Sequence, residues 1–412
     1  MINYNLSDIK NIINNFDNEE ELNKELSNQN LSKLTANINN ETYYILRYNK
    51  TKLNNSNINT LGLNRSIVIH NNKIISFSPP KSISFEEFSK NNKVNDIILE
   101  EFIDGTMINL FHMPGLNDPD LGDWQIATRS SVGGKNFFFF QPEHKKSFRD
   151  MFIETYKKSN FNFDLLSTDL CYSFVLQHPL NRIVTPLNTS NLYFISAYKI
   201  NNETFTITKV NNSELHSKFE KSNILIPKSY NVSCYKDYSE ISDKWAAENT
   251  NFDTVGIMLY SNDYSVRSKI RNPNYEAVRE LRGNQPKLQF RYLALRQNSH
   301  DKVREFLKFY PEYRDDFNKY NKQVIKFEET LFDFYVKCHM KKLLKHKDIQ
   351  YEYKVHIYHI HNIFLNKLKP KNKFVTLSTI KEYLNSIHPA KLMYSLNYSN
   401  YSETAKISTV TE

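Results

Sequence analysis

Five segments between residues 64 and 275 place charged side chains beside short apolar runs. The segments are residues 64–88, 99–111, 124–135, 172–184 and 253–275. Among the groups that they supply are several cations and the dipeptide Asp104-Gly105. The cations are Arg65, Lys81, Arg129, Lys135, Arg182, Lys269 and Arg271. Arginine and lysine can clamp phosphate groups, and glycine lets the backbone turn tightly beside a ligand.

Each of these features also has a simpler interpretation. Asp104-Gly105 is a common hairpin dipeptide, and Lys81, which follows two prolines, could be a solvated loop lysine. Arg182 could pair with a structural carboxylate instead of a phosphate. Residues 130–134, Ser-Ser-Val-Gly-Gly, could form a phosphate-binding loop or a flexible hairpin. The residues alone leave these alternatives open.

The elements that would position these groups are predominantly strands. Between residues 42 and 281, apolar runs alternate with Asn, Asp, Gly or Pro. Runs of four to eight residues rich in β-branched and aromatic side chains predict strands, and short connections favour antiparallel pairing. The expected strands are residues 43–48, 66–70, 73–77, 107–112, 172–177, 192–198, 204–210 and 254–260. A helix is expected at residues 145–158, where apolar residues share one face.

After residue 286 the apolar spacing becomes helical. Apolar side chains step by three or four residues from Phe317 to Cys338, which predicts one long amphipathic helix. Thr376 or Ser378 could cap a further helix. The C-terminal part of the chain is therefore expected to be entirely helical.

We expect two domains and an α+β fold class, because 412 residues exceed the roughly 250–300 at which a single core stops growing. Residues 1–286 form the antiparallel sheet domain, with residues 1–40 as a polar helical lead-in, and residues 287–412 form the all-helical domain. The second domain holds 23 Lys and Arg against 13 Asp and Glu, a net of +10, whereas the first holds 31 against 32. A basic domain predicts binding to a polyanion, although a solvated lysine-rich surface is the alternative.

In this order, the five segments resemble the motifs of the phage-type RNA ligases, the lysine-adenylating tRNA-repair ligases of the covalent nucleotidyltransferase superfamily. That family has an Arg-Gly-Ile strand, a Pro-x-x-Lys turn, Lys-x-Asp-Gly, Asn-Arg-Ile-Val, Glu-Gly-x-Val and Lys-x-Lys. The sharpest matches are Asn-Arg-Ile-Val at residues 181–184 and Asp-Gly-Thr at residues 104–106. The resemblance covers residues 42–280.

The resemblance implies a nucleotidyltransferase-like fold that binds ATP, Mg²⁺ and RNA ends, either tRNA-like or from other structured RNA. In the family a lysine amine attacks the α-phosphate of ATP, and the adenylate then passes to an RNA 5′-phosphate. The resemblance assigns Asp104 to catalysis, and Gly105 and the seven cations to nucleotide or phosphate binding. Lys81 matches the lysine of the turn, and Lys269-Ile-Arg271 matches Lys-x-Lys.

The chain departs from the family at the groups that perform covalent chemistry. With Asp104-Gly105 aligned, Phe102 occupies the position of the nucleophilic lysine, and phenylalanine cannot form a phosphoramide. A serine or valine within residues 173–175 replaces the glutamate of the fourth segment. We expect a degenerate ligase-like protein that binds RNA ends and ATP, or one with an altered route in which Lys81 is a substitute nucleophile.

The alternative is a structural or interaction protein that binds nucleic acid nonspecifically through residues 287–412. No stretch approaches the roughly 18 consecutive apolar residues of a membrane span, and the first residues do not resemble a signal peptide. The expected location is the cytoplasm, a viral factory or a virion, because the family is rich in phage and viral members. The protein partners do not follow from the sequence.

Two other kinds of site are not expected. The cysteines are too widely spaced for a disulfide framework or a CxxC metal pair. They are Cys171, Cys234 and Cys338. The histidines at 356, 359 and 361 do not share one helical face, which favours satisfied or solvent-facing roles over zinc binding.

Overall fold

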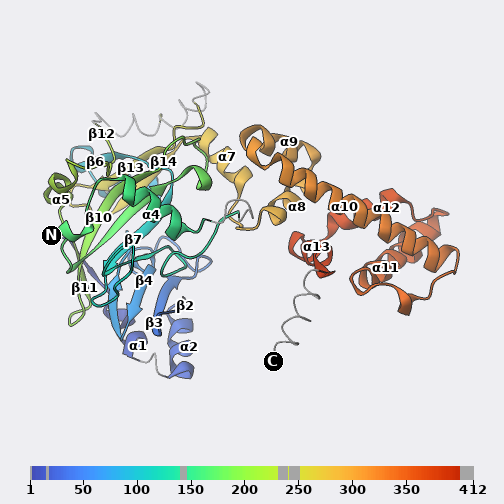
Figure 1. The fold of residues 1–412 in the computed structure, drawn as a ribbon, viewed down its shortest axis with the longest axis horizontal. Helices are drawn as coiled ribbons and strands as arrows, with labels where there is room; N and C mark the ends of the chain where they lie inside the picture. Colours follow the sequence, from blue (N-terminus) through green and yellow to red (C-terminus); the bar gives the residue numbers. More distant parts are fainter. Residues whose placement is uncertain (1, 15–17, 140–145, 231–239, 241–250, 400–412) are drawn as a thin grey trace. The chain divides into compact units, whose positions relative to one another are not determined.

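The computed structural model describes residues 2–14, 18–139, 146–230, 240 and 251–399 (Figure 1). The chain forms two compact units, Met1–Arg279 and Glu280–Glu412. Three antiparallel sheets lie in the first unit, and the described part of the second unit contains helices and their connections. The expected fold class, antiparallel sheets followed by a helical region, is confirmed. Cys234 lies outside the described residues.

The largest sheet has six strands in the order β1-β11-β10-β9-β7-β8, and every neighbouring pair is antiparallel. Its strands are β1 (Ile2–Asn5), β7 (Thr106–His112), β8 (Trp124–Ala127), β9 (Leu170–Gln177), β10 (Asn191–Asn201) and β11 (Thr206–Lys209). Aromatic side chains such as Phe174 and Phe194 fill the core on one face with helices α4 (Phe148–Lys158) and α5 (Asn212–Phe219). The opposite face carries the buried polar residues Asn109, Ser173 and Ser196.

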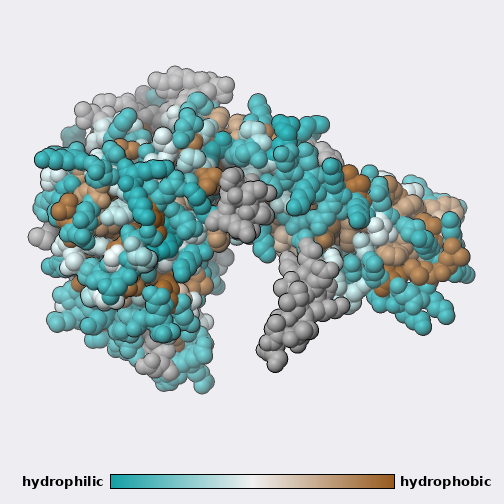
Figure 2. Space-filling view, viewed as in Figure 1, coloured by the Kyte–Doolittle hydropathy of each residue, from teal (hydrophilic) through white to brown (hydrophobic). Residues whose placement is uncertain are grey.

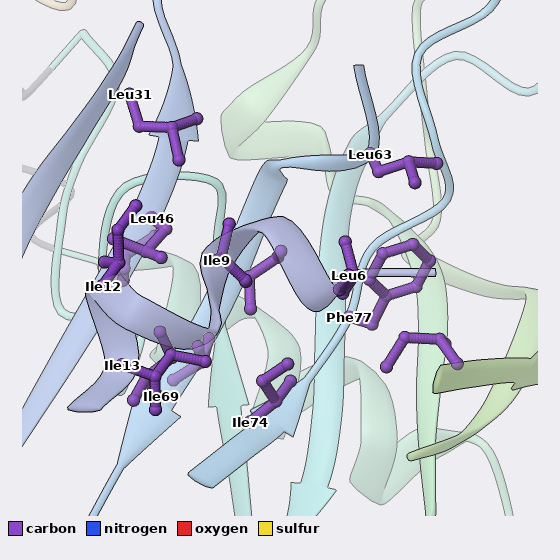
Figure 3. Packing of buried hydrophobic residues seen from close by; sticks show 14 of the residues in the cluster. Leu6, Ile9, Ile12, Ile13, Leu31, Leu46, Leu63, Ile69, Ile74 and Phe77 are labelled. Carbon is purple, nitrogen blue, oxygen red and sulfur yellow. The ribbon is translucent and has the colours of Figure 1, made fainter. Parts of the chain in front are cut away.

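A four-stranded sheet near the N-terminus has the order β2-β3-β4-β5. Its strands are β2 (Leu31–Ile38), β3 (Glu41–Tyr48), β4 (Arg65–His70) and β5 (Lys73–Ser76). Helices α1 (Lys10–Asn14) and α2 (Glu19–Asn28) lie beside it (Figure 1). Figure 3 shows Ile9, Ile12 and Ile13 packed with Leu46 and Ile69 of the sheet.

The helical lead-in expected at residues 1–40 is therefore only partly correct. Helices α1 and α2 are present, but β1 and β2 occupy the two ends of this segment. Pairing explains the difference, since β1 completes the edge of the large sheet beside β11 and β2 pairs with β3 over eight residues. Hydrogen bonds to distant strands outweigh the weak local preference of an Asn- and Glu-rich sequence.

A second four-stranded sheet has the order β12-β6-β13-β14. Its strands are β6 (Ile97–Glu101), β12 (Ser229–Tyr230), β13 (Gly256–Ser261) and β14 (Arg267–Arg271). We call it the hairpin sheet, because β13 and β14 form a hairpin. One face packs Leu99, Leu259 and Ile270 against helix α3 (Phe85–Asn91). Alternate residues therefore project to the other face, which carries the charges described below.

The helical unit follows α7 (Pro273–Arg282), a helix that the sequence analysis did not anticipate. The later helices are α8 (Leu288–Asn298), α9 (His300–Phe309), α10 (Arg314–Tyr335), α11 (Tyr351–Ile363), α12 (Leu377–Ser386) and α13 (Pro389–Leu396). The long amphipathic helix is α10, and Thr376 caps α12 as one of the two predicted possibilities. A buried ion pair joins Arg296 to Glu328. Within the described helices, none is long and apolar enough to cross a membrane.

Gly256 at the start of β13 provides a test of how tightly the hairpin sheet is built. Its φ is 142°, and a Cβ there would lie 2.1 Å from the carbonyl oxygen of Ile270. We expect Gly256→Ala to lower the free energy of unfolding by about 2–5 kcal/mol, through backbone strain and overpacking. Gly115→Ala is the control, because Gly115 also has a positive φ, 80°, but no atom within 4 Å. Urea unfolding should show a clearly larger loss for Gly256→Ala; equal losses would contradict the steric argument.

Candidate functional site

The face of the hairpin sheet opposite helix α3 carries a row of partly buried cations. Arg267, Lys269 and Arg271 alternate along β14, so their side chains share one face, while Ser268 and Ile270 between them are buried. Lys269 lies opposite Met258 and Arg271 opposite Gly256 in the pairing with β13. Three positive charges at alternate positions of one strand repel each other, which is costly unless a ligand neutralises them.

The carbonyl groups of Pro79 and Pro80 connect Arg65 on β4 with Arg267 on β14. The Nη1 of Arg65 and the Nη2 of Arg267 donate to the Pro79 carbonyl at 3.4 and 3.1 Å, and the Nε of Arg267 donates to the Pro80 carbonyl at 2.8 Å. Proline has no N–H, so this segment contributes acceptors without adding donors. The two guanidinium groups are therefore held together by one carbonyl oxygen.

The N-terminal sheet adds more positive charge at the same place. A register shift in the pairing of β3 with β4 puts Arg47 directly opposite Arg65. Arg129, which follows β8, lies over the ring of Tyr48 at 5.7 Å from its centroid. The buried Nε of Arg129 finds no acceptor among the described residues. A donor in this state is available to an incoming ligand.

Eight basic side chains are thus close enough to influence one another electrostatically. We call them the cation cluster: Arg47, Lys50, Arg65, Lys81, Arg129, Arg267, Lys269 and Arg271. Within the described part of the chain, only Arg271 forms an ion pair, with Glu276 at 2.9 Å. Unit charges about 4 Å apart near a protein surface interact by about 4 kcal/mol. So much unneutralised charge in one place indicates an anion-binding site.

The pKa values respond to burial and to this mutual repulsion. Burial, followed by Arg271, Lys81, Arg65 and Arg267, lowers the pKa of Lys269 to about 7. Burial and Arg267 lower the pKa of Arg65 to about 10. Burial and Arg65 likewise lower the pKa of Lys81. Burial and repulsion from these neighbours thus favour the neutral amine of Lys269 over its charged form.

A cavity of about 190 Å³ adjoins the cation cluster, and Lys81 and Arg267 line both. Four tyrosines dominate the cavity lining. They are Tyr4, Tyr198, Tyr260 and Tyr264. The ammonium of Lys209 lies over the Tyr264 ring at 3.6 Å, and the Tyr264 hydroxyl donates to Glu100 at 3.0 Å. Burial raises the pKa of the Glu100 carboxyl and lowers that of Lys209 to about 8. The cavity has aromatic walls and a few polar groups, as ligand sites commonly do.

Phe102 lies beside the row of cations on the hairpin sheet. Its N–H donates to the Gly256 carbonyl at 3.3 Å, and the guanidinium of Arg271 lies 5.2 Å from its ring centroid. This cation–π contact is compatible with a phenylalanine at a strongly positive site. The amine that the family would place here is absent, and an apolar ring supports the neighbouring arginine instead.

Asp104 is engaged by three hydrogen-bond donors. Its carboxylate accepts from the N–H groups of Val184 and Thr185, at 3.0 and 3.2 Å, and from the Tyr275 hydroxyl at 2.7 Å. At Gly105, a Cβ would lie 2.5 Å from Val175. The Asp-Gly turn therefore ties the 184–185 loop and α7 to the sheets. These contacts describe a positioning role for Asp104, and its assignment to catalysis remains a hypothesis.

The remaining predicted residues lie apart from these interactions. Arg182 follows the 3₁₀ helix Pro179–Asn181 and is not among the main groups that lower the pKa of Arg65, Lys81 or Lys269. Lys135 is exposed. The glycine pair at 133–134 packs against β8 and the start of α4, so this segment is a tight turn.

Sequence reasoning missed Arg267, Arg47 and Lys50. Arg267 could have been found, because it precedes Lys269 by two residues and side chains two apart on a strand share one face. Arg47 enters the cluster through a register shift between two strands, and no single-strand pattern reveals such a shift. Lys50 lies in the turn after β3, where apolar periodicity gives no information.

The described residues offer no larger cluster of metal-binding side chains. They contain no group of three or more His, Cys, Asp or Glu side chains arranged around a common point. Ser173, one of the two positions that the sequence analysis aligned with the family's glutamate, donates to Asn109 at 2.9 Å inside the sheet. His356 is hydrogen-bonded to Tyr383 and Ser395, both at 2.9 Å, and burial lowers its pKa to about 4. It therefore has the satisfied role that the sequence favoured.

No protein-family model matches the chain, and neither does any curated protein. Among solved structures it is similar to a proposed ATP-dependent DNA ligase from Aquifex aeolicus, with a TM-score of 0.41 and 15% identity over 84% of this chain and 80% of that one. It is also similar to one form of an archaeal ATP-dependent RNA ligase, with a TM-score of 0.39 and 11% identity over 74% and 79%. These values are too low to assign residues or an activity.

The lowered pKa of Lys269 predicts a pH-dependent gain in stability when its amine is removed. A lysine with a pKa of about 7 when folded and 10.5 when unfolded destabilises the fold fully below pH 7, and this penalty disappears as the pH rises to 10.5. We expect Lys269→Met to be more stable than the parent at pH 6–7 and the difference to shrink by pH 10. Thermal unfolding across this range measures it.

Lys73→Met is the matched control, because Lys73 is exposed at the start of β5. Its difference from the parent should not change over the same pH range. A Lys269→Met curve that runs parallel to the parent from pH 6 to 10 would show that the amine is not held in a positive environment.

Proposed function

We propose that this chain is an RNA-ligase-like protein of the nucleotidyltransferase type whose cation cluster binds the phosphates of an RNA 5′ end and of a nucleoside triphosphate such as ATP. The observation that carries the proposal is the gathering of eight cations with only one ion pair among the described residues. Phosphate oxygens are the ligands that guanidinium and ammonium groups hold best. The order of the sequence motifs gives independent support.

The cavity beside the cluster suits the base of a nucleotide. An apolar cavity of about 150 Å³ can hold a benzene ring, so 190 Å³ is enough for a flat ring system but not for a whole nucleotide. A base stacked among Tyr4, Tyr198 and Tyr260 would leave its phosphates outside, beside Lys81 and Arg267, which line the cavity. Each part of a nucleotide thus meets a surface of matching chemistry.

The cluster itself would supply most of the charge that neutralises the phosphates. Glu276, the carboxylate that forms an ion pair with the cluster among the described residues, is bound by Arg271 and Arg279. A magnesium ion would therefore arrive as a counter-ion of the triphosphate, held mainly by phosphate oxygens and water. This differs from a site in which several protein carboxylates bind the metal.

The helical unit offers a second, less specific surface for RNA. Residues 336–374 contain ten lysines and two acidic residues. The apolar or aromatic side chains of Leu343, Tyr351 and Tyr358 are 60–73% exposed, and Figure 2 shows hydrophobic surface in this part of the unit. Lysines that contact phosphates and exposed rings that stack on bases are the usual components of single-strand binding. This surface would add affinity without reading the end of the strand.

A 5′-phosphate should be recognised by the cation cluster. Because a hydrogen bond to a charged group contributes about 1.5–3 kcal/mol, a 5′-phosphorylated RNA should bind about 10- to 100-fold more tightly than its 5′-hydroxyl form. The double variant Lys81→Gln, Lys269→Gln should lose this preference and should still fold, since it reduces repulsion. Fluorescence anisotropy with the two RNAs measures it, and Lys73→Gln is the control. A wild-type protein with no preference would refute the proposal.

Lysines of the helical unit should behave differently. Changing the exposed Lys341, Lys342, Lys345 and Lys347 to Gln should weaken binding of both RNAs equally, and each lost phosphate contact should reduce the salt slope by about 0.7. The control changes four exposed lysines of the first unit, which alters the net charge by the same amount. They are Lys10, Lys24, Lys73 and Lys93. If all binding is lost with the helical lysines and neither RNA end is preferred, the nonspecific alternative is correct.

A further inference from the structure

Within the cation cluster, Lys269 combines a free amine with partial burial, whereas Lys50 is exposed. No described residue accepts a hydrogen bond from its Nζ or forms an ion pair with it, although the side chain is partly buried. By contrast, the Nζ of Lys81 donates to the Ser82 carbonyl at 3.1 Å, and that of Lys209 lies over the Tyr264 ring. An amine that reacts with phosphorus must have a free lone pair and access to the ligand.

The position of Lys269 is also suited to reaction with a bound nucleotide. In the hairpin sheet, Lys269 is opposite Met258 on β13, and Met258 is opposite Glu100 on β6. Phe102 directly follows β6, and its ring lies beside Arg271, which shares one face of β14 with Lys269. The amine thus lies on the surface from which the missing nucleophile would have acted, two strands away.

We propose that Lys269 is the nucleophile of a covalent nucleotidyl transfer in this chain. The inference rests on the proposed binding of a nucleoside triphosphate at the cation cluster. The Nζ lone pair attacks the α-phosphorus and forms a P–N bond. The bond from that phosphorus to the oxygen that bridges to the β-phosphorus breaks, pyrophosphate leaves with the electron pair, and a proton passes from Nζ to solvent. The product is a lysine–nucleoside monophosphate phosphoramidate.

The neighbours of Lys269 suit this step. Arg271 and Arg267 flank it on the same face of β14, and Lys81 and Arg65 are near enough to lower its pKa. Their charges can stabilise the negative charge that develops on the phosphoryl oxygens and on the leaving pyrophosphate. Partial burial and the same charges lower the pKa of Lys269 to about 7, which favours the neutral amine that the attack requires.

The full-length protein should be incubated with Mg²⁺ and ATP that is labelled at either the α- or the γ-phosphate. After denaturing electrophoresis, we expect label on the protein from the α-position only, in a bond that acid cleaves and alkali leaves intact. Mass spectrometry should locate the adduct on Lys269. GTP, labelled in the same way, shows whether the base is selected.

The decisive variant is Lys269→Arg, which keeps the positive charge but cannot form this adduct under the same conditions. It should lose the label completely, whereas Lys73→Arg should be labelled as strongly as the parent. The Lys81→Arg variant should still carry the label, but less of it than the parent. Label that survives in Lys269→Arg and disappears in Lys81→Arg would overturn the proposal and identify Lys81 as the nucleophile.

Equilibrium binding of ATP to the parent and to Lys269→Arg tests the proposed nucleotide site separately from the proposed nucleophile. If both bind ATP but the parent acquires no label, the nucleophile proposal fails and the proposed nucleotide site stands. If neither binds ATP, both proposals fail. Thermal unfolding of each variant confirms that a loss of label reflects chemistry and not a loss of fold.

Discussion

Mutual repulsion among like charges is the constraint around which the first unit is organised. Arg47 and Arg65 face each other across two strands, and Arg267, Lys269 and Arg271 alternate on a third. An arrangement of this kind lowers stability in the absence of a ligand. The chain holds it in place with backbone acceptors, above all the Pro79 carbonyl shared by two guanidinium groups, and with cores on the far sides of both small sheets. Binding of an anion would reduce this repulsion and so stabilise the fold.

The positions around the cation cluster differ in chemical character from the cluster itself. The ring of Phe102 lies beside the Arg271 guanidinium. Ser173 donates to Asn109 inside the large sheet. The members of the cation cluster come from all three sheets and from the segment around Pro79. Lys269 on β14 stands among these cations with a free amine and a pKa lowered to about 7.

Much of the fold followed from the sequence, because short alternating runs bounded by Asn, Gly and Pro carry strong strand signals. The runs at 43–48, 66–70 and 107–112 all correspond to strands. The features that the sequence did not predict depend on contacts between residues far apart in the chain. β1 and β2 exist because distant strands complete their hydrogen bonds, and Arg47 joins the cluster through a register shift. Asp104 was recognised as important, but its partners Val184, Thr185 and Tyr275 are far away in sequence. No local pattern identifies contacts of that range.

The tyrosine-lined cavity is assembled from the two ends of the first unit. Tyr4 lies on the first strand of the chain, and its hydroxyl donates to the carbonyls of Tyr264 and Ser265, both at 3.4 Å. A chain growing on the ribosome cannot make these contacts until almost the whole unit has emerged, and closing so long a loop is slow. This cavity is consequently among the last features to form during biosynthesis. An incomplete chain therefore carries the cations of the cluster without the complete tyrosine-lined cavity beside them.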